Sequence, residues 1–297
     1  MRILHFRALL ILFFIFKLTY AATDPKWTTP IAPFQITDNL YYVGSQDLAS
    51  YLVVDPKGNI LIDANLASSP PQIRASVEKL GFRWEDTRIL LNSQAHFDHI
   101  AGAAEVVRET HAKNMVMDGD ASVVETGSRT DFLAPSPNIL SYPPAHVDRV
   151  LHDGDTVGLG SVILTAHKTA GHTRGCTTWT MRSHIPGEPA GMLRDIVIVG
   201  GVGFWGEYHF VASPNHPVSY PGILEDFEHT FAVLRALPCD VFLGAHGAYF
   251  DMLTKLQRDH REGPRVFIDH AGYEKFVADA QRTFERAVSE QRAHAAR

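Results

Sequence analysis

Basic residues are in the minority in this sequence. The 297 residues include 27 Lys and Arg against 33 Asp and Glu, which gives a formal net charge of −6. Binding to nucleic-acid phosphates needs a surplus of positive side chains, so this balance argues against a nucleic-acid partner. The sequence also lacks internal repeats and low-complexity stretches. Its 45% of apolar and 20% of charged residues exclude a mainly disordered or fibrous chain.

Long apolar runs are missing beyond the first two dozen residues. The run at residues 8–16 is unbroken, but it is too short for a bilayer, which takes about 20 residues. It follows Arg2 and Arg7 and is itself followed by small residues suited to signal peptidase, which is the order of a secretory signal. We therefore expect residues 1–22 to be a cleaved signal peptide and residues 23–297 to form one domain.

The expected cleavage has consequences for charge and location. It would remove three basic residues (Arg2, Arg7 and Lys17) and no acidic ones, so the formal charge of −6 becomes −9. No cysteine closely follows the apolar run, which argues against a lipid anchor. We expect a periplasmic protein without a stable membrane anchor, and we expect it to be a monomer.

Cysteine is scarce, and the two cysteines of the chain, Cys176 and Cys239, lie far apart in the sequence. An exported protein could pair them. The sequence alone does not show that their Cα atoms come within reach of a disulfide. Both the paired and the free state therefore stay open.

Short runs of β-forming residues alternate with stretches of helical periodicity along the rest of the chain. A turn signal at residues 55–58 between two such runs predicts a hairpin. Further along, strand–helix–strand order predicts parallel pairing and an α/β architecture. The proline-rich residues 129–144 predict a surface loop. The strands are expected at residues 40–44, 50–54, 59–63, 87–92, 114–118, 161–166, 176–181, 195–200 and 240–243, and the helices at residues 71–80, 100–110, 222–237 and 273–288.

Four polar residues follow the strand expected at residues 87–92, namely Gln94, His96, Asp98 and His99. Loops at strand ends collect functional side chains, and neutral imidazole and carboxylate are natural ligands of a catalytic zinc. In a chain with 16 histidines this short pattern is only suggestive by itself. Histidines with a structural role, or histidines on the surface, could produce the same sequence pattern.

Two later histidines strengthen the case for a metal centre. His172 and His246 each follow an expected strand and have a glycine beside them, which lets the backbone approach closely. Three strand ends would then direct ligands toward one edge of the fold. The candidates are too many for one tetrahedral zinc and suit two metals with open positions for water. They are Gln94, His96, Asp98, His99, His172 and His246.

This pattern resembles that of the metallo-β-lactamase superfamily, whose signature is H-x-H-x-D-H followed by two distant histidines. In more detail, the chain is similar to the third subclass of class B β-lactamases, in which a histidine rather than a cysteine completes the second metal site. Asp98, His99 and His246 match that set. The resemblance implies a four-layer αββα sandwich with the metals at one edge between the sheets. The segments that carry the closer likeness are residues 27–34, 142–145, 171–175 and 235–240.

One position departs from the signature, because Gln94 stands where the family usually has its first histidine. The sequence looks like a branch of the subclass with Gln at this position. An amide oxygen is a weak zinc ligand and carries no negative charge. The first metal site, with Gln94, His96 and His172, should therefore bind less tightly than a three-histidine site. The second site keeps the anionic Asp98 and should keep its metal when the first is empty.

The resemblance implies zinc-dependent hydrolysis of the β-lactam amide bond of penicillins, cephalosporins and carbapenems. A metal-bound hydroxide would attack the lactam carbonyl, whose oxygen the metal polarises, and the second metal would stabilise the departing nitrogen. Asp98 would hold that metal and orient the attacking water as the catalytic residue. Gly201, Gly203 and Tyr208 fall roughly where the subclass has substrate-binding residues. Asp63, at a strand end, either orients a ligand histidine or caps a turn.

A fold does not fix its substrate, so other interpretations stay open. A lactonase or a thioesterase of the glyoxalase II type would use the same fold and metals, although export and the subclass-like segments argue against both. The acidic charge disfavours a nuclease. A protein of another class, a non-catalytic metal-binding protein, would keep the ligands but lack an open position for water. The favoured interpretation requires only a small β-lactam molecule as partner.

Overall fold

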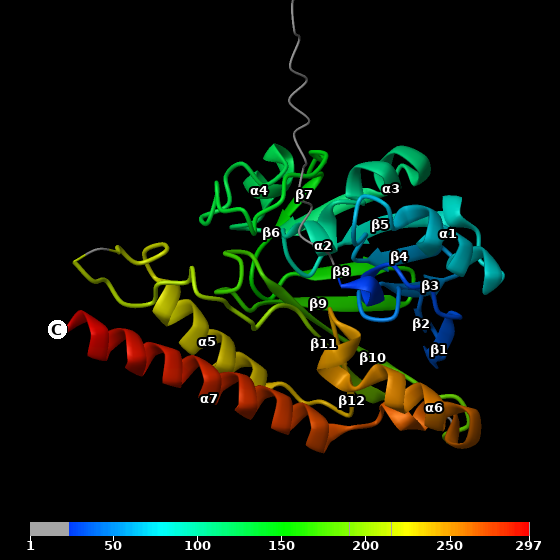
Figure 1. The fold of residues 1–297 in the computed structure, drawn as a ribbon. Helices are drawn as coiled ribbons and strands as arrows, with labels where there is room; N and C mark the ends of the chain where they lie inside the picture. Colours follow the sequence, from blue (N-terminus) through cyan, green and yellow to red (C-terminus); the bar gives the residue numbers. More distant parts are fainter. Residues whose placement is uncertain (1–23, 190, 215, 297) are drawn as a thin grey trace, which may run out of the picture.

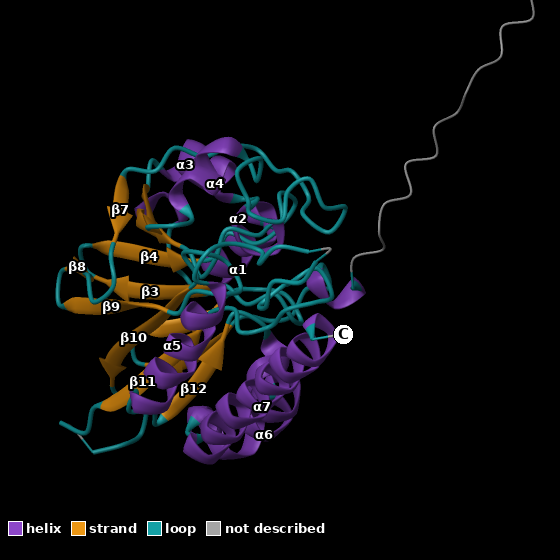
Figure 2. Cartoon of the chain, turned by 90° about the vertical axis from the view of Figure 1, so that its left-hand side faces the viewer, coloured by secondary structure: helices purple, strands orange, loops and turns teal. Residues whose placement is uncertain are grey.

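Two β-sheets pack together in the computed structural model, which describes residues 24–189, 191–214 and 216–296. The expected signal peptide at residues 1–22 lies outside the described residues. Helices α1, α3 and α4 lie on the outer side of the first sheet, and α5 and α7 pack against the second (Figures 1 and 2). The layers follow the order helix, sheet, sheet, helix, as the resemblance implies.

The first sheet has seven strands in the order β1-β2-β3-β4-β5-β6-β7. Strands β1 to β4 are antiparallel neighbours, whereas β4 to β7 run parallel. The predicted hairpin is confirmed as the turn between β3 and β4. The strands are β1 (Phe34–Thr37), β2 (Leu40–Tyr42), β3 (Tyr51–Asp55), β4 (Gly58–Ile62), β5 (Thr87–Leu91), β6 (Lys113–Met117) and β7 (Arg149–Leu151).

The second sheet has five strands in the order β12-β11-β10-β9-β8. Strand β10 is antiparallel to both β9 and β11, and β11 is parallel to β12. The carboxyl ends of β9, β11 and β12 therefore point the same way. The strands are β8 (Thr156–Leu159), β9 (Val162–Lys168), β10 (Thr177–Ser183), β11 (Arg194–Val199) and β12 (Val241–Gly244).

The helices follow the predicted periodicity in part. Helices α1 and α5 match their predicted ranges to within one residue, whereas the helix predicted at residues 100–110 is split into α2 and α3 and the last helix is longer than predicted. Within the described residues, no helix is both long and apolar enough to cross a bilayer. The helices are α1 (Pro70–Lys79), α2 (Phe97–Ile100), α3 (Ala103–Thr110), α4 (Ala121–Thr126), α5 (Ile223–Ala236), α6 (Met252–Glu262) and α7 (His270–Ala295), with short 3-10 helices η1 (Pro25–Trp27), η2 (Trp84–Asp86), η3 (Gly247–Phe250) and η4 (Gly263–Phe267).

The central strands are buried on both faces. In β5, Leu90 packs with the helices of the first layer and Leu91 packs between the sheets, and Leu61 and Ile62 of β4 divide in the same way. Successive side chains of a strand point to opposite faces, so a strand covered on both sides reads as a continuous apolar run. These rigid strands fix the positions of the loops that follow them.

Candidate metal centre

Loops from both sheets meet at one edge of the sandwich. The loop after β5 carries residues 94–99, the loop after β9 carries His172, and the loop after β12 carries His246. Backbone hydrogen bonds join the two sheets beside these loops. Thr177, the first residue of β10, donates to Ser93 (2.8 Å), and Ala49, between β2 and β3, donates to Ala245 (3.0 Å). The fold therefore brings together all six side chains that were predicted from the sequence to be ligands.

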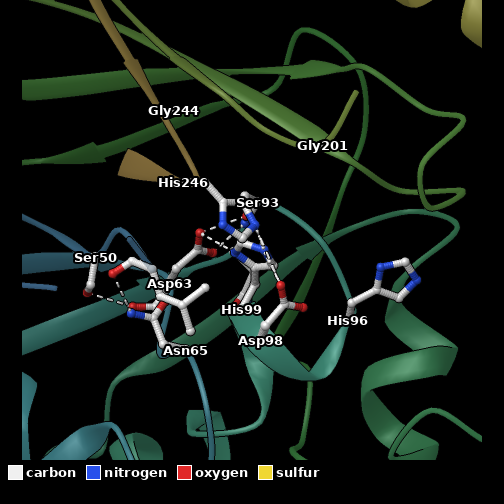
Figure 3. A network of polar contacts seen from close by, with 12 residues as sticks. Ser50, Asp63, Asn65, Ser93, His96, Asp98, His99, Gly201, Gly244 and His246 are labelled. Carbon is white, nitrogen blue, oxygen red and sulfur yellow. Dashed lines mark hydrogen bonds and ion pairs between the residues drawn. The ribbon is translucent and has the colours of Figure 1, made fainter. Parts of the chain in front are cut away.

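Asp98, His99 and His246 form one cluster at this edge, named the acid site below (Figure 3). Asp98 Oδ2 lies 3.2 Å from His99 Nε2 and 3.6 Å from His246 Nε2, and the two imidazole nitrogens are 3.2 Å apart. Ligand atoms around a tetrahedral zinc with bonds of about 2.05 Å are about 3.3 Å from one another. The three atoms are thus spaced as three corners of a zinc tetrahedron, which leaves one corner for another ligand.

Two carboxylates behind the acid site orient its imidazoles. Asp47 Oδ2 accepts a hydrogen bond from His246 Nδ1 (2.9 Å), and Asp63 Oδ2 lies 3.4 Å from His99 Nδ1. These contacts favour a proton on each Nδ1 and leave each Nε2 free to bind a metal. The Asp63 carboxylate also accepts hydrogen bonds from the N–H and the hydroxyl of Ser93, both at 2.7 Å. Both of the roles considered for Asp63 are therefore present together.

Gln94, His96 and His172 form a second cluster, named the amide site below. His96 Nδ1 and His172 Nε2 are 3.1 Å apart, and His172 Nδ1 donates to the Gly203 carbonyl at 2.7 Å. Gln94 Oε1 is buried and has no hydrogen-bond partner among the described residues. A buried acceptor left unpaired costs free energy unless a water molecule or a cation satisfies it. The three side chains therefore fit a second metal.

The two sites differ in their electrostatics. Burial lowers the pKa of His99, but the carboxylates of Asp98 and Asp63 outweigh burial and raise this pKa to about 10. Burial and the neighbouring His96 lower the pKa of His172 to about 3. The acid site thus attracts positive charge, whereas the amide site has no carboxylate among its ligands.

A cavity of about 450 Å³ opens onto both sites, and all the candidate ligands except the deeper His99 line it. A cavity of this kind, with a few polar groups on one side of an apolar wall, suits a small organic molecule. A larger hollow of about 690 Å³ lies near Asp55 and Arg83 and contains none of the candidate ligands. The apolar wall of the ligand-lined cavity consists of Trp27, Phe97, Pro137, Leu140, Trp205 and Tyr249.

The three residues predicted to bind substrate lie behind His172 instead of lining this cavity. A Cβ atom on Gly201 would come within 2.3 Å of the His172 ring, so only glycine fits there. Gly203 accepts the hydrogen bond from that ring through its carbonyl, and the buried Tyr208 donates its hydroxyl to the His172 carbonyl at 2.6 Å. In the structure all three position a candidate ligand. The cavity-lining residue of this segment is Trp205.

Asp47, Trp27 and Trp205 are among the site residues that sequence reasoning missed. Asp47 has no motif around it, and its role appears only when the fold brings it to His246. Trp27 lies in a segment that resembled the family, so it could have been found, and its indole Nε1 donates to Asp47 Oδ2 at 3.1 Å. Trp205 lies between Gly203 and Tyr208, in a segment that matches the subclass only roughly, so its place was not predictable.

The two cysteines are free and buried. Cys176 lies next to the site, where its Sγ accepts a hydrogen bond from the Gly201 N–H at 2.8 Å. Burial raises the pKa of both thiols to about 12. Of the two states that the sequence left open, the structure therefore has the unpaired one.

Comparison with known proteins places this fold and site in a family. The pattern that defines the metallo-β-lactamase superfamily matches residues 48–246, a segment that contains all six candidate ligands. The chain therefore belongs to the metallo-β-lactamase superfamily.

Two solved structures narrow the resemblance. The FEZ-1 metallo-β-lactamase from Legionella gormanii is 43% identical, with a TM-score of 0.83, and the match covers 89% of this chain and 98% of that one. LRA-12, a class B3 di-zinc metallo-β-lactamase from an Alaskan soil metagenome, is 32% identical, with a TM-score of 0.80 and coverage of 90% and 98%. The neighbours of this chain are thus metallo-β-lactamases, including members of subclass B3.

A curated relative is more distant. A probable metallo-hydrolase of Burkholderia pseudomallei is 28% identical over 145 residues, which is 48% of this chain. The alignment spans only 46% of that protein's length. This match therefore supports the family and adds nothing about the substrate.

Proposed function

We propose that this protein is a zinc-dependent hydrolase of the β-lactam amide bond, acting on penicillins, cephalosporins and carbapenems. The observation that carries the proposal is the acid site, whose three ligand atoms lie 3.2 to 3.6 Å apart beside a cavity with apolar walls. The 43% identity to FEZ-1 over 89% of the chain supports the same class of substrate.

Zinc bound in these sites would supply a Lewis acid for the lactam carbonyl and a water molecule of lowered pKa. Asp98 would act as the catalytic residue. It directs Oδ2 at the two imidazoles of the acid site, which leaves Oδ1 to orient the attacking water and to accept its proton. Such a reaction needs no covalent acyl-enzyme and no activated serine.

The cavity walls would bind the apolar parts of the substrate. Trp27 and Phe97 lie together on the wall, with ring centroids 6.0 Å apart, and the Trp205 ring is 5.8 Å from that of His96. Aromatic surfaces next to the ligands would exclude bulk water from the scissile bond and strengthen the polar contacts made there.

We further propose one essential zinc at the acid site and a second, more weakly held zinc at the amide site. The anionic ligand of the acid site supports this order, because Gln94 gives the amide site only a neutral oxygen. We also propose export to the periplasm through the signal at residues 1–22 and function as a monomer, with residues 23–297 as a single domain. The charge and apolarity of the signal segment support export.

Turnover of a chromogenic cephalosporin by the purified mature protein tests the proposal, followed by a penicillin and a carbapenem. We expect hydrolysis of all three. A strong chelator should abolish the activity, and the serine-directed inhibitor clavulanate should leave it unchanged.

Other outcomes would support the alternatives. Hydrolysis of a lactone or of a glutathione thioester without any turnover of lactams would indicate another hydrolase of the superfamily. Stoichiometric zinc binding without turnover of any of these substrates would indicate a non-catalytic metal-binding protein. Hydrolysis that survives exhaustive chelation would rule out the metal mechanism.

A further inference from the structure

Ala95 lies between two candidate ligands of the amide site, Gln94 and His96, and distant side chains hold both of its backbone polar groups. Its N–H donates to Asp120 Oδ2 at 2.9 Å, and its carbonyl accepts a hydrogen bond from the Tyr142 hydroxyl at 2.6 Å. All these groups are buried. The peptide units on either side of Ala95 therefore cannot rotate without leaving a buried group unpaired.

The Asp120 carboxylate also holds the loop that carries His172. Besides Ala95, it accepts hydrogen bonds from the Thr173 hydroxyl (2.7 Å, to Oδ2) and from the Gly175 N–H (2.8 Å, to Oδ1). The residue is 1% exposed. Hydrogen bonds to a buried carboxylate are short and strong. One side chain thus fixes both loops on which the amide-site ligands lie.

This use of Asp120 replaces the one that its position would favour. Asp120 is the N-cap residue of α4, where an aspartate commonly accepts a hydrogen bond from the first turn of the helix. Its side chain makes no such bond. The neighbouring backbone is also closely packed, since a Cβ on Gly175 would lie 2.7 Å from Asp120 Cβ. The carboxylate is therefore directed at the two loops and not at its own helix.

We propose that Asp120 and Tyr142 are positioning residues for the amide site: they set the separation of its three ligands and thereby its affinity for metal. The inference rests on the metal centre of the proposed function. The acid site has separate supports, because Asp47 and Asp63 orient its imidazoles. Loss of the Asp120 contacts should therefore weaken one site and spare the other.

Zinc titration of the metal-stripped, full mature protein against a chromophoric chelator tests this proposal, because it gives the two affinities separately. Asp120→Asn keeps the shape of the side chain, but its amide nitrogen must face one of the donors. We expect the amide site to bind zinc about 10- to 100-fold more weakly, the usual loss when a residue outside the ligand set that orients the ligands is replaced. The affinity of the acid site should not change.

Additional variants separate positioning from folding. Tyr142→Phe and Thr173→Val each remove one hydroxyl from the network and should weaken zinc binding at the amide site by a smaller factor. Thr173→Ser keeps the hydroxyl, so its amide site should bind zinc as tightly as in the parent. Each change is also made together with Gln94→His, in which three imidazoles bring the affinity of the amide site into the range of the titration.

Asp55→Asn is the matched control. Asp55 accepts hydrogen bonds from the N–H and hydroxyl of Ser161 and from the N–H of Lys57, at 2.8 to 2.9 Å, so it has the same kinds of donor as Asp120. It lies away from the ligand-lined cavity. This variant should leave both zinc affinities unchanged.

Several results would overturn the inference. These are an unchanged amide site in Asp120→Asn, equal weakening of both sites, the same loss in Asp55→Asn, or failure of the Gln94→His protein to take up a second equivalent of zinc. The titration contains no lactam. A protein that binds zinc as expected but hydrolyses no cephalosporin would therefore contradict the proposed function and leave this inference standing.

Discussion

The six candidate ligands differ in what each side chain offers a metal. Asp98 brings negative charge, the four imidazoles bring neutral nitrogen, and Gln94 brings only the weakly basic oxygen of an amide. Carboxylates stand behind both sites: Asp63 and Asp47 behind the acid site, and Asp131 behind the amide site, where its Oδ2 lies 3.6 Å from His96 Nε2. The difference between the sites therefore lies in the ligands themselves, because no carboxylate is a ligand of the amide site. The effect of losing a ligand should therefore depend on the site to which it belongs.

Alanine substitutions test this ranking. We expect Asp98→Ala and His246→Ala each to lower kcat/KM for a cephalosporin by more than about 100-fold, since losing only the partner of a zinc ligand already costs 10- to 100-fold. Gln94→Ala should cost less than about tenfold, because it removes a weak ligand of the second metal. Steady-state kinetics and the zinc content of each variant provide the measurement. Similar losses in all three variants would show that both sites matter alike.

Replacing Gln94 by His should tighten the amide site. An imidazole nitrogen is a stronger zinc ligand than an amide oxygen, and the buried Gln94 side chain lines the same cavity as His96 and His172. A metal titration at fixed pH should show a second equivalent that binds more tightly than in the parent, while turnover need not rise. If the variant held no more zinc than the parent, Gln94 would not be a ligand.

At this scale the sequence predicted ligands but not the residues that support them. Gln94, His96, Asp98 and His99 share one loop after a recognisable buried strand, so their spacing carried the signal. Asp120 reaches its partners across separate loops, and no spacing rule describes such a contact. Residues of that kind become visible only once the fold has placed the loops.

Among the elements, two loops form one wall of the cavity and are joined by a single carboxylate. Glu207 accepts hydrogen bonds from the Ser136 hydroxyl, the Asn138 amide and the Trp205 indole, each with a contact of 2.7 Å. Asn138 and Trp205 both line the cavity. These donors lower the pKa of Glu207, which keeps it ionised and able to accept all three bonds at neutral pH.

Glu207→Gln should therefore loosen the cavity wall without touching the metal ligands. We expect KM for a cephalosporin to rise by up to about tenfold, because a hydrogen bond to a neutral acceptor is weaker than one to a charged acceptor by about 1 to 1.5 kcal/mol. The value of kcat should change by less than about twofold. Glu188→Gln, which disturbs the pair with Arg194 away from the cavity, should change neither. A fall in kcat with unchanged KM would contradict this role for Glu207.

The secondary structure predicted from the sequence agrees with the structure where apolar periodicity is strong. It differs where polar contacts determine the length of a helix. The last helix was expected to end at residue 288, after its final buried valine, yet α7 continues to Ala295. Gln291 Oε1 accepts hydrogen bonds from the N–H groups of Phe210 and Val211, at 2.7 and 3.1 Å, and holds this extension. Helix α6 was missed because most of its residues are polar.

At the scale of the whole molecule, Asp55 joins the two sheets. It ends β3 in the first sheet and accepts hydrogen bonds from the N–H and the hydroxyl of Ser161, which lies between β8 and β9 in the second. The N–H groups of Ser161 and Lys57 are the main cause of a lowered pKa for the Asp55 carboxyl. This contact should therefore make the stability of the fold depend on pH.

The direction of that dependence follows from the lowered pKa. A carboxyl with a lower pKa in the folded than in the unfolded state stabilises the fold above the unfolded value of about 3.9 and loses this effect as pH falls through the folded value. We expect Asp55→Asn to lower the free energy of unfolding at pH 7, and the difference from the parent to shrink as the pH falls below about 4. Urea unfolding of the metal-free proteins at several pH values measures this. A constant difference would contradict it.

The sandwich as a whole could be predicted only through family resemblance. Strand–helix–strand order indicated parallel pairing, which holds for β4 to β7 and for β11 with β12, but the remaining pairs are antiparallel. Which strands become neighbours depends on contacts between distant segments, and short apolar runs look alike in either arrangement. The site could still be predicted, because its ligands lie at strand ends in both the parallel and the antiparallel arrangement.

The most direct test of this account is the rate of cephalosporin hydrolysis as zinc is returned to the metal-stripped protein. The acid site should fill first, so we predict no turnover without metal and recovery of most of the activity with the first equivalent of zinc. Turnover by the stripped protein, or a fully zinc-loaded protein that hydrolyses no lactam, would contradict the central claim that the acid site is the centre of a metal-dependent β-lactamase.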